Sequence, residues 1–222
     1  MKLEMEDVME YRSTLERNLL TISYGEPHEL YDFLVVLDPV GGGSDSGISG
    51  YGISEKELAL EVARQVRRSF SMSNVELYLT RTEDVEVSGQ ARMDFVEAVD
   101  ADLYIRIGAQ ADAEDPDAYG VQTYYNEEYF IPGFGNVDLA DIVTRQVTIA
   151  SSNRAIGISP AQEESILRSI RIPAVELSLG YLSNPQEEML LEQEAYRQKL
   201  AEGILNAISV ACERLEQLRE EE

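Results

Sequence analysis

The sequence predicts an α/β fold of three layers, in which helices cover both faces of a mainly parallel, twisted sheet of about five or six strands. Two observations predict it. Strand-length apolar runs alternate with helical patterns, and the first run, DFLVVLD at 32–38, is almost continuously apolar, as in a strand buried on both faces. A chain of 222 residues with 44% apolar residues can bury a substantial core. In such folds the functional loops follow the carboxyl ends of the strands.

Several independent signals mark the first helix after this run. In ISEKELALEVARQVRRSF, at 53–70, Ser54 and Glu57 have the spacing of a capping box. Apolar residues then recur every four positions and predict one buried face; they are Leu58, Val62, Val66 and Phe70.

The remaining elements continue the alternation. Strand-like runs occupy 75–81, 101–111, 120–126 and the segment that begins at 173. Helical patterns occupy about 91–99, 139–150 and 194–218, and Asn184 followed by Pro185 predicts the start of another helix.

No linker or repeat divides these elements, so we expect a single domain over 31–218. Apolar residues spaced among the charges of the first 20 positions predict a lead-in segment at 1–30 that is helical. The last residues, 219–222, are expected to form an acidic tail.

Composition limits the partners. There are 42 acidic against 18 basic residues, a formal charge of −24, which opposes binding to nucleic acid or anionic lipid. No stretch approaches the roughly 18 apolar residues of a membrane span, and the first 13 residues are acidic where a signal peptide would be basic. Either the protein is cytoplasmic, or a signal or anchor is absent from this sequence.

The order of motifs resembles one known family. Over about residues 32–210 the chain is similar to the zinc-dependent N-acetylmuramoyl-L-alanine amidases of bacterial cell walls, whose fold is also described as zinc-exopeptidase-like. The motifs that carry the resemblance are VVLDPVGGGSDSG, EKELAL, VELYLTRTED, ARMDFVEAVDADLYIRIGAQA, GVQTYY, PAVELSLGYLSNPQEE and AYRQKLAEGILNAI. Several motifs in the correct order are far more specific than any one of them.

The resemblance implies a catalytic zinc held by His, Glu and His, with a later Glu as general base for the water that attacks the amide between muramic acid and L-alanine. This chain departs from that pattern at three positions. Gly41 and Gly108 stand where the family has its two metal histidines, and Ser178 stands where the family has the general base. Only Glu55 matches a ligand, and it is equally explained as a first-turn carboxylate that favours the helix. A shifted register that makes Glu176 the base is a less favoured alternative.

The number of histidines limits the metal sites that the chain can form, whatever the alignment. The chain contains a single histidine, His28, which precedes the first strand of the domain in a polar loop and is expected to be solvated. One subunit therefore cannot supply a zinc site with two histidines. We expect zinc, and any other cofactor, to be absent. The glycines at 41–43 then either keep a ligand groove open or only form a turn.

Two charged residues are expected to replace the metal site. Arg106 and Glu176 each precede a lost position by two residues, so they point to the same sheet face as Gly108 and Ser178 respectively. If their strands are neighbours, we expect a buried ion pair beneath the former site, and removing one partner would cost roughly 3 to 5 kcal/mol. The alternative is that one of them reaches solvent and the two never meet.

Other residues are predicted to support or flank the site. Arg81 and Arg92 match the family pattern and are expected to brace loops by pairing with carboxylates. An aromatic segment, YYNEEYFIPGFG, is expected to form a lip beside the groove that stacks on sugar or peptide or, as we favour, contacts a protein partner. Its principal residues are Tyr124, Tyr125, Tyr129 and Phe130.

These observations favour a catalytically inactive, amidase-like domain of the bacterial cell envelope, a pseudoenzyme that binds peptidoglycan or a cell-wall protein. The alternative is an active peptidoglycan hydrolase with a different metal on Glu55 and either Asp38 or Asp45, or a metal site completed by another subunit. An extracytoplasmic location follows from the resemblance alone.

Overall fold

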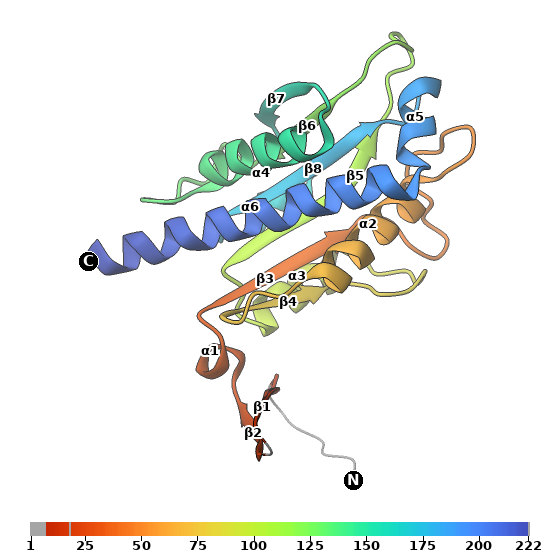
Figure 1. Ribbon diagram of the computed structural model, residues 1–222. Helices are drawn as coiled ribbons and strands as arrows, with labels where there is room; N and C mark the ends of the chain where they lie inside the picture. Colours follow the sequence, from red (N-terminus) through yellow and green to blue (C-terminus); the bar gives the residue numbers. More distant parts are fainter. Residues whose placement is uncertain (1–7, 18, 222) are drawn as a thin grey trace.

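A computed structural model describes residues 8–17 and 19–221. A six-stranded sheet forms its centre, in the order β4-β3-β5-β8-β6-β7 (Figure 1). The four strands β4 (Val75–Leu79), β3 (Phe33–Pro39), β5 (Leu103–Gln110) and β8 (Ala174–Tyr181) are parallel. The strands β6 (Val121–Tyr125) and β7 (Ala155–Pro160) run in the opposite direction, because β6 pairs antiparallel with β8. The predicted three-layer, mainly parallel α/β fold is confirmed.

Three long helices cover one face of the sheet: α2 (Glu55–Ser69), α4 (Asn136–Ser151) and α6 (Glu194–Glu221) (Figure 1). Alternate strand residues, among them Val35, Ile105 and Leu177, join these helices in the larger core. The other face is covered by α3 (Gly89–Ala98) and the 3₁₀ turn at Ile166–Arg168, which pack with Val36 and Tyr104. A shorter helix, α5 (Pro185–Leu191), follows β8.

The N-terminal segment does not have the predicted helical structure. Residues predicted to be helical form an antiparallel hairpin of β1 (Glu10–Glu16) and β2 (Leu19–Gly25), followed by one helical turn, α1 (Pro27–Leu30). The aromatic and β-branched residues of this segment favour an extended chain, which the spacing of its leucines had obscured. The first seven residues of the predicted lead-in lie outside the described residues.

The prediction of an acidic tail at 219–222 is also wrong, because helix α6 continues through residue 221. Arg219 holds the end of the helix on the domain: its guanidinium donates to Asp102 (2.7 Å) and to the carbonyl of Asp32 (2.9 Å). Residue 222 lies outside the described part of the chain. Among the described residues, no helix combines the length and the apolar character that a membrane crossing requires.

The edge strand β7 was not predicted. Its six residues include Gly157 and end at Pro160, and most of them are partly or fully exposed, so neither a continuous apolar run nor a clear alternation marks it. Proline is tolerated there because an edge strand has no partner on one side.

Candidate active site

The residues that the resemblance assigns to the family's site lie near the carboxyl ends of β3, β5 and β8. The parallel register of β5 and β8 places Gly108 beside Ser178 and, two residues earlier along the strands, Arg106 beside Glu176. These four residues lie on the sheet face that α3 partly covers, because they share the alternation of Tyr104. Gly108 and Ser178 therefore lie next to the pair of Arg106 and Glu176.

Glu55 approaches this point from the first turn of α2. The capping box predicted for that helix is present, since the backbone N–H of Ser54 donates to the carboxylate of Glu57 (3.0 Å). The Glu55 carboxylate is buried, and both of its oxygens accept backbone N–H groups: Oε1 from Ala109 (2.8 Å) and Oε2 from Ile48 (3.0 Å). Burial raises the pKa of Glu55, although these two N–H donors oppose the shift. Glu55 thus ties the loop before α2 to the end of β5.

The volume in front of Gly108 is filled by this carboxylate. A Cβ atom added to Gly108 would lie 2.6 Å from Oε1 of Glu55 and 3.3 Å from a methyl group of Val40. Gly41 has φ +67°, and a Cβ atom there would lie 2.7 Å from the carbonyl oxygen of Asp45. The local backbone therefore requires glycine at position 41, whereas a side chain at position 108 would have to displace the Glu55 carboxylate.

Ser178, at the position of the general base, is only 3% exposed. Its hydroxyl lies 3.5 Å from the carbonyl oxygen of Gly180, the limit of a hydrogen bond. A serine hydroxyl does not accept a proton from water near neutral pH, so this side chain cannot replace a carboxylate base.

The residues at this point do not fit a zinc site of the kind that the family pattern implies. Gly41 and Gly108 have no donor side chain, and Glu55 already accepts a backbone N–H on each oxygen. Over 8–17 and 19–221, no three or more His, Cys, Asp or Glu side chains are grouped so as to hold a metal ion. His28 lies at the opposite end of the strands, just before β5 begins, where Nε2 is 2.9 Å from the carbonyl oxygen of Asp100.

The two alternative carboxylates are also engaged. Asp38 is completely buried and pairs with Arg92, Thr80 and the hydroxyl of Tyr104. Asp45 lies in the loop, and its carboxylate accepts the backbone N–H of Gly47 (3.0 Å). Neither carboxylate belongs to a described group that could hold a metal ion.

Arg106 and Glu176 form a loose pair. Nε of Arg106 lies 3.7 Å from Glu176 and 3.9 Å from Asp38, and it is a buried atom without a hydrogen-bond partner among the described residues. The Arg106 side chain is 23% exposed and that of Glu176 is 31% exposed. Burial disfavours the charged guanidinium, but Glu176, Tyr104 and Asp38 outweigh it, so the pKa of Arg106 is raised. Burial also raises the pKa of Glu176, against the effect of Arg106.

The expected ion pair is thus present, but two of its expected properties are wrong. The side chains are partly exposed rather than buried, and the guanidinium does not donate a hydrogen bond to Glu176. The physical reason is that Arg106 faces two carboxylates from one position and lies midway between them.

Comparison with known proteins identifies the family of the chain. The family model described as N-acetylmuramoyl-L-alanine amidase matches residues 35–210. The chain belongs to that amidase family. A curated relative, the "Probable cell wall amidase LytH" of Staphylococcus aureus, is 31% identical over 189 residues, which are 83% of this chain and 60% of the relative. The chain therefore spans only about three-fifths of the length of the curated relatives it matches.

Solved amidase structures share the fold. An N-acetylmuramoyl-L-alanine amidase from Clostridium difficile 630 has a TM-score of 0.75 and 26% sequence identity, covering 82% of this chain and 97% of its own. The catalytic domain of CwlV, an N-acetylmuramoyl-L-alanine amidase from Bacillus (Paenibacillus) polymyxa var. colistinus, has the same TM-score and identity, covering 82% of this chain and 98% of its own.

Two arginines brace the amidase loop that follows β3. Arg92 pairs with Asp38 as predicted, and it also donates to the carbonyl of Gly41 (2.7 Å). Arg81 differs from the prediction, because its donors meet backbone carbonyls instead of a carboxylate. It bonds Val40 (2.7 Å) and Lys56 (2.8 Å). The backbone carbonyls of this loop therefore accept hydrogen bonds from two arginine side chains.

The predicted aromatic lip is not formed. Tyr124 lies on the face of the site, beside Glu176 in register, and its hydroxyl donates to Gln110 (2.8 Å). Tyr125 points to the opposite face and packs in the larger core. Because β6 runs antiparallel to β8, the residues that follow β6 lie near the amino end of β8, away from the site. Tyr129 stacks there on Arg171, 4.8 Å from the ring centre, and Phe130 is 83% exposed.

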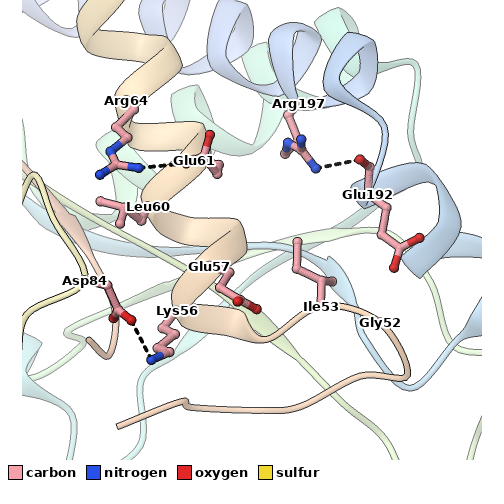
Figure 2. A pocket seen from close by; sticks show the side chains of 10 residues that line it. All are labelled: Gly52, Ile53, Lys56, Glu57, Leu60, Glu61, Arg64, Asp84, Glu192 and Arg197. Carbon is pink, nitrogen blue, oxygen red and sulfur yellow. Dashed lines mark hydrogen bonds and ion pairs between the residues drawn. The ribbon is translucent and has the colours of Figure 1, made fainter. Parts of the chain in front are cut away.

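A charged groove of about 510 Å³ lies beside the site, along the outer face of α2 (Figure 2). Its cations already have partners: Lys56 bonds Asp84 (2.9 Å) and the carbonyl of Gly43 (2.7 Å), and Arg64 bonds Glu61 (2.9 Å). Lys56 therefore adds a third cationic support to the loop. Sequence reasoning missed Lys56, although it adjoins Glu55, and it considered Asp38 only as a metal ligand, whereas Asp38 pairs with Arg92, Thr80 and Tyr104.

Proposed function

We propose that this chain is a catalytically inactive amidase domain of the bacterial cell envelope, which binds peptidoglycan or a cell-wall protein without cleaving an amide. The observation that carries the proposal is the environment of Glu55. The single remaining ligand of the family pattern has both oxygens committed to backbone N–H groups. Metal-assisted hydrolysis needs a Lewis acid with an open position and a base for its water, and neither requirement has a residue here.

The proposal includes the absence of resident zinc. Elemental analysis of protein purified without chelator is expected to find far less than one zinc per chain. Incubation with purified peptidoglycan is expected to release no L-alanine-linked peptides, while a zinc-dependent amidase run in parallel releases them. Stoichiometric zinc together with chelator-sensitive release would overturn the proposal.

The alternative is an active amidase with a non-standard or intersubunit metal site. Its carboxylates within this chain would be Asp38 or Asp45, and Asp38 is occupied by Arg92, Thr80 and Tyr104. A metal centre would therefore need donors from a second subunit. Activity that appears only with concentrated protein or added divalent metal would favour this alternative.

Binding experiments distinguish a peptidoglycan partner from a cell-wall protein partner. Co-sedimentation with purified, insoluble peptidoglycan tests the polysaccharide directly, and the control is Ser178→Arg, which would obstruct the face of the former site. The charge of −24 disfavours anionic polymers, and this supports an uncharged or basic partner. An envelope location is supported by the relative that is named a cell wall amidase.

A further inference from the structure

The hairpin of β1 and β2 has an exposed apolar face. Cross-strand register places Tyr11 beside Tyr24 and Leu15 beside Leu20, with Ile22 between them on the same face. These side chains are exposed, up to 71% for Leu15 and Tyr24. In Figure 1 the hairpin projects away from the six-stranded sheet, and it forms a separate two-stranded sheet.

An isolated two-stranded sheet is marginally stable in water, and three or more strands with an apolar face are normally needed. The two edges of this hairpin differ. β1 carries charged residues, and Arg12 and Glu10 extend to the carbonyl of Leu30 and the hydroxyl of Tyr78. The seven residues of β2, LLTISYG, include no charge and no proline. Charges and prolines are the usual protection of an open edge, so β2 is unprotected.

We propose that two copies of this chain pair through β2, as antiparallel strands related by a two-fold axis at Ile22. That register places Leu20 opposite Tyr24 of the other copy on the apolar face, and Thr21 opposite Ser23 on the other face. An aromatic side chain opposite an aliphatic one is a favourable cross-strand pair, and so are two hydroxyl side chains opposite each other. The result is a four-stranded sheet whose apolar face is continuous across both copies.

The self-complementary sequence of β2 favours a second copy as the occupant, and the local charge permits it. The chain has a charge of −24, so most contacts between two copies would bring acidic surfaces together. Residues 10–25 contain two acidic and two basic residues, a net charge of zero, and β2 contains none. The hairpin is therefore a place where two copies can meet without repulsion. Insertion into an anionic lipid surface is disfavoured by the overall charge.

One ladder of this length is smaller than a standard protein interface, so the dimer is expected to be weak and reversible. Sedimentation equilibrium of the whole chain from about 10 to about 500 µM should show a concentration-dependent shift from monomer to dimer. Ile22→Lys places two cations opposite each other on the axis and should raise the dissociation constant by at least about tenfold.

The matched control is Ser13→Lys, which adds the same charge to the same face but on β1, directly across from Ile22. It should leave most of the association intact. Both variants should retain the melting temperature of the domain, because both side chains are exposed. A chain that stays monomeric throughout, or loss of the dimer in the Ser13→Lys variant, would overturn pairing through β2.

Discussion

Glu55 and the Arg106–Glu176 pair both lie near the carboxyl ends of β5 and β8, but they are stabilised in different ways. Glu55 is buried and accepts one N–H on each oxygen at 2.8 and 3.0 Å. Arg106 approaches two carboxylates at 3.7 and 3.9 Å and bonds neither of them. One carboxylate has been absorbed into the backbone network, while the pair retains only a longer-range attraction.

The difference shows that a carboxylate beside a loop and an arginine within a strand find partners in different ways. A carboxylate next to a loop can exchange a metal for backbone N–H donors, since both satisfy its lone pairs. An arginine at the middle of a strand can shift only its side chain, and the position of its strand fixes the distance to each carboxylate. Glu55 should therefore contribute more to stability than the pair, and substitutions can test this.

The largest effect is expected for Gly108→His, which restores a family ligand. Its Cβ atom would displace the Glu55 carboxylate from Ala109 and press on Val40. Losing one buried hydrogen bond and overpacking the site should together lower the free energy of unfolding by about 3 kcal/mol. Urea unfolding measures this, and zinc should give little or no protection.

The control for that substitution is Gly89→His. Gly89 begins α3, and a Cβ atom there meets nothing within 4 Å. This variant should lose less than about 1 kcal/mol. Equal losses in the two variants, or a Gly108→His protein stabilised strongly by zinc, would mean that Glu55 yields easily to a ligand.

The second effect is that of Glu55→Gln. The amide retains one acceptor oxygen but turns its NH₂ group toward a backbone N–H, which leaves a buried donor without a partner. We expect a loss of about 1 to 3 kcal/mol in unfolding free energy. Glu61→Gln on the same helix removes a surface pair with Arg64 and should change stability by less than about 0.5 kcal/mol. Equivalent behaviour of the two variants would contradict a bracing role for Glu55.

The architecture could be predicted because strands buried on both faces and capped helices each leave a local pattern in the sequence. The pairing of Gly108 with Ser178 and of Arg106 with Glu176 followed from strand alternation and a parallel register. The prediction of a lip that includes Tyr129 was wrong, because the position of this segment depends on the direction of β6 relative to β8, which local patterns do not encode. The two hydrogen bonds of Glu55 depend on the path of the loop backbone, which side-chain patterns do not encode.

The third prediction concerns the coupling between Arg106 and Glu176. Because both side chains are partly exposed and no hydrogen bond joins them, a double-mutant cycle with Arg106→Met and Glu176→Gln should give about 0.5 to 1 kcal/mol. This is well below the 3 to 5 kcal/mol expected of a buried, hydrogen-bonded pair. A coupling in that higher range would show that the pair closes in solution and would remove its contrast with Glu55.

The smallest expected effect is a change in how stability depends on pH. The pKa of Glu176 is raised in the folded protein by burial, which Arg106 partly opposes. A carboxyl whose folded pKa exceeds its unfolded value stabilises the protein most at low pH, and that contribution is lost as pH rises through the folded pKa. From about pH 4.5 upward, the Glu176→Gln protein should therefore lose less unfolding free energy than the unsubstituted protein. Urea unfolding at several pH values from about 4.5 to 7 measures the two slopes, and the Gln side chain keeps the volume constant. A steeper decline in the variant would mean that Arg106 lowers the pKa of Glu176 below its ordinary value, as a tight ion pair would.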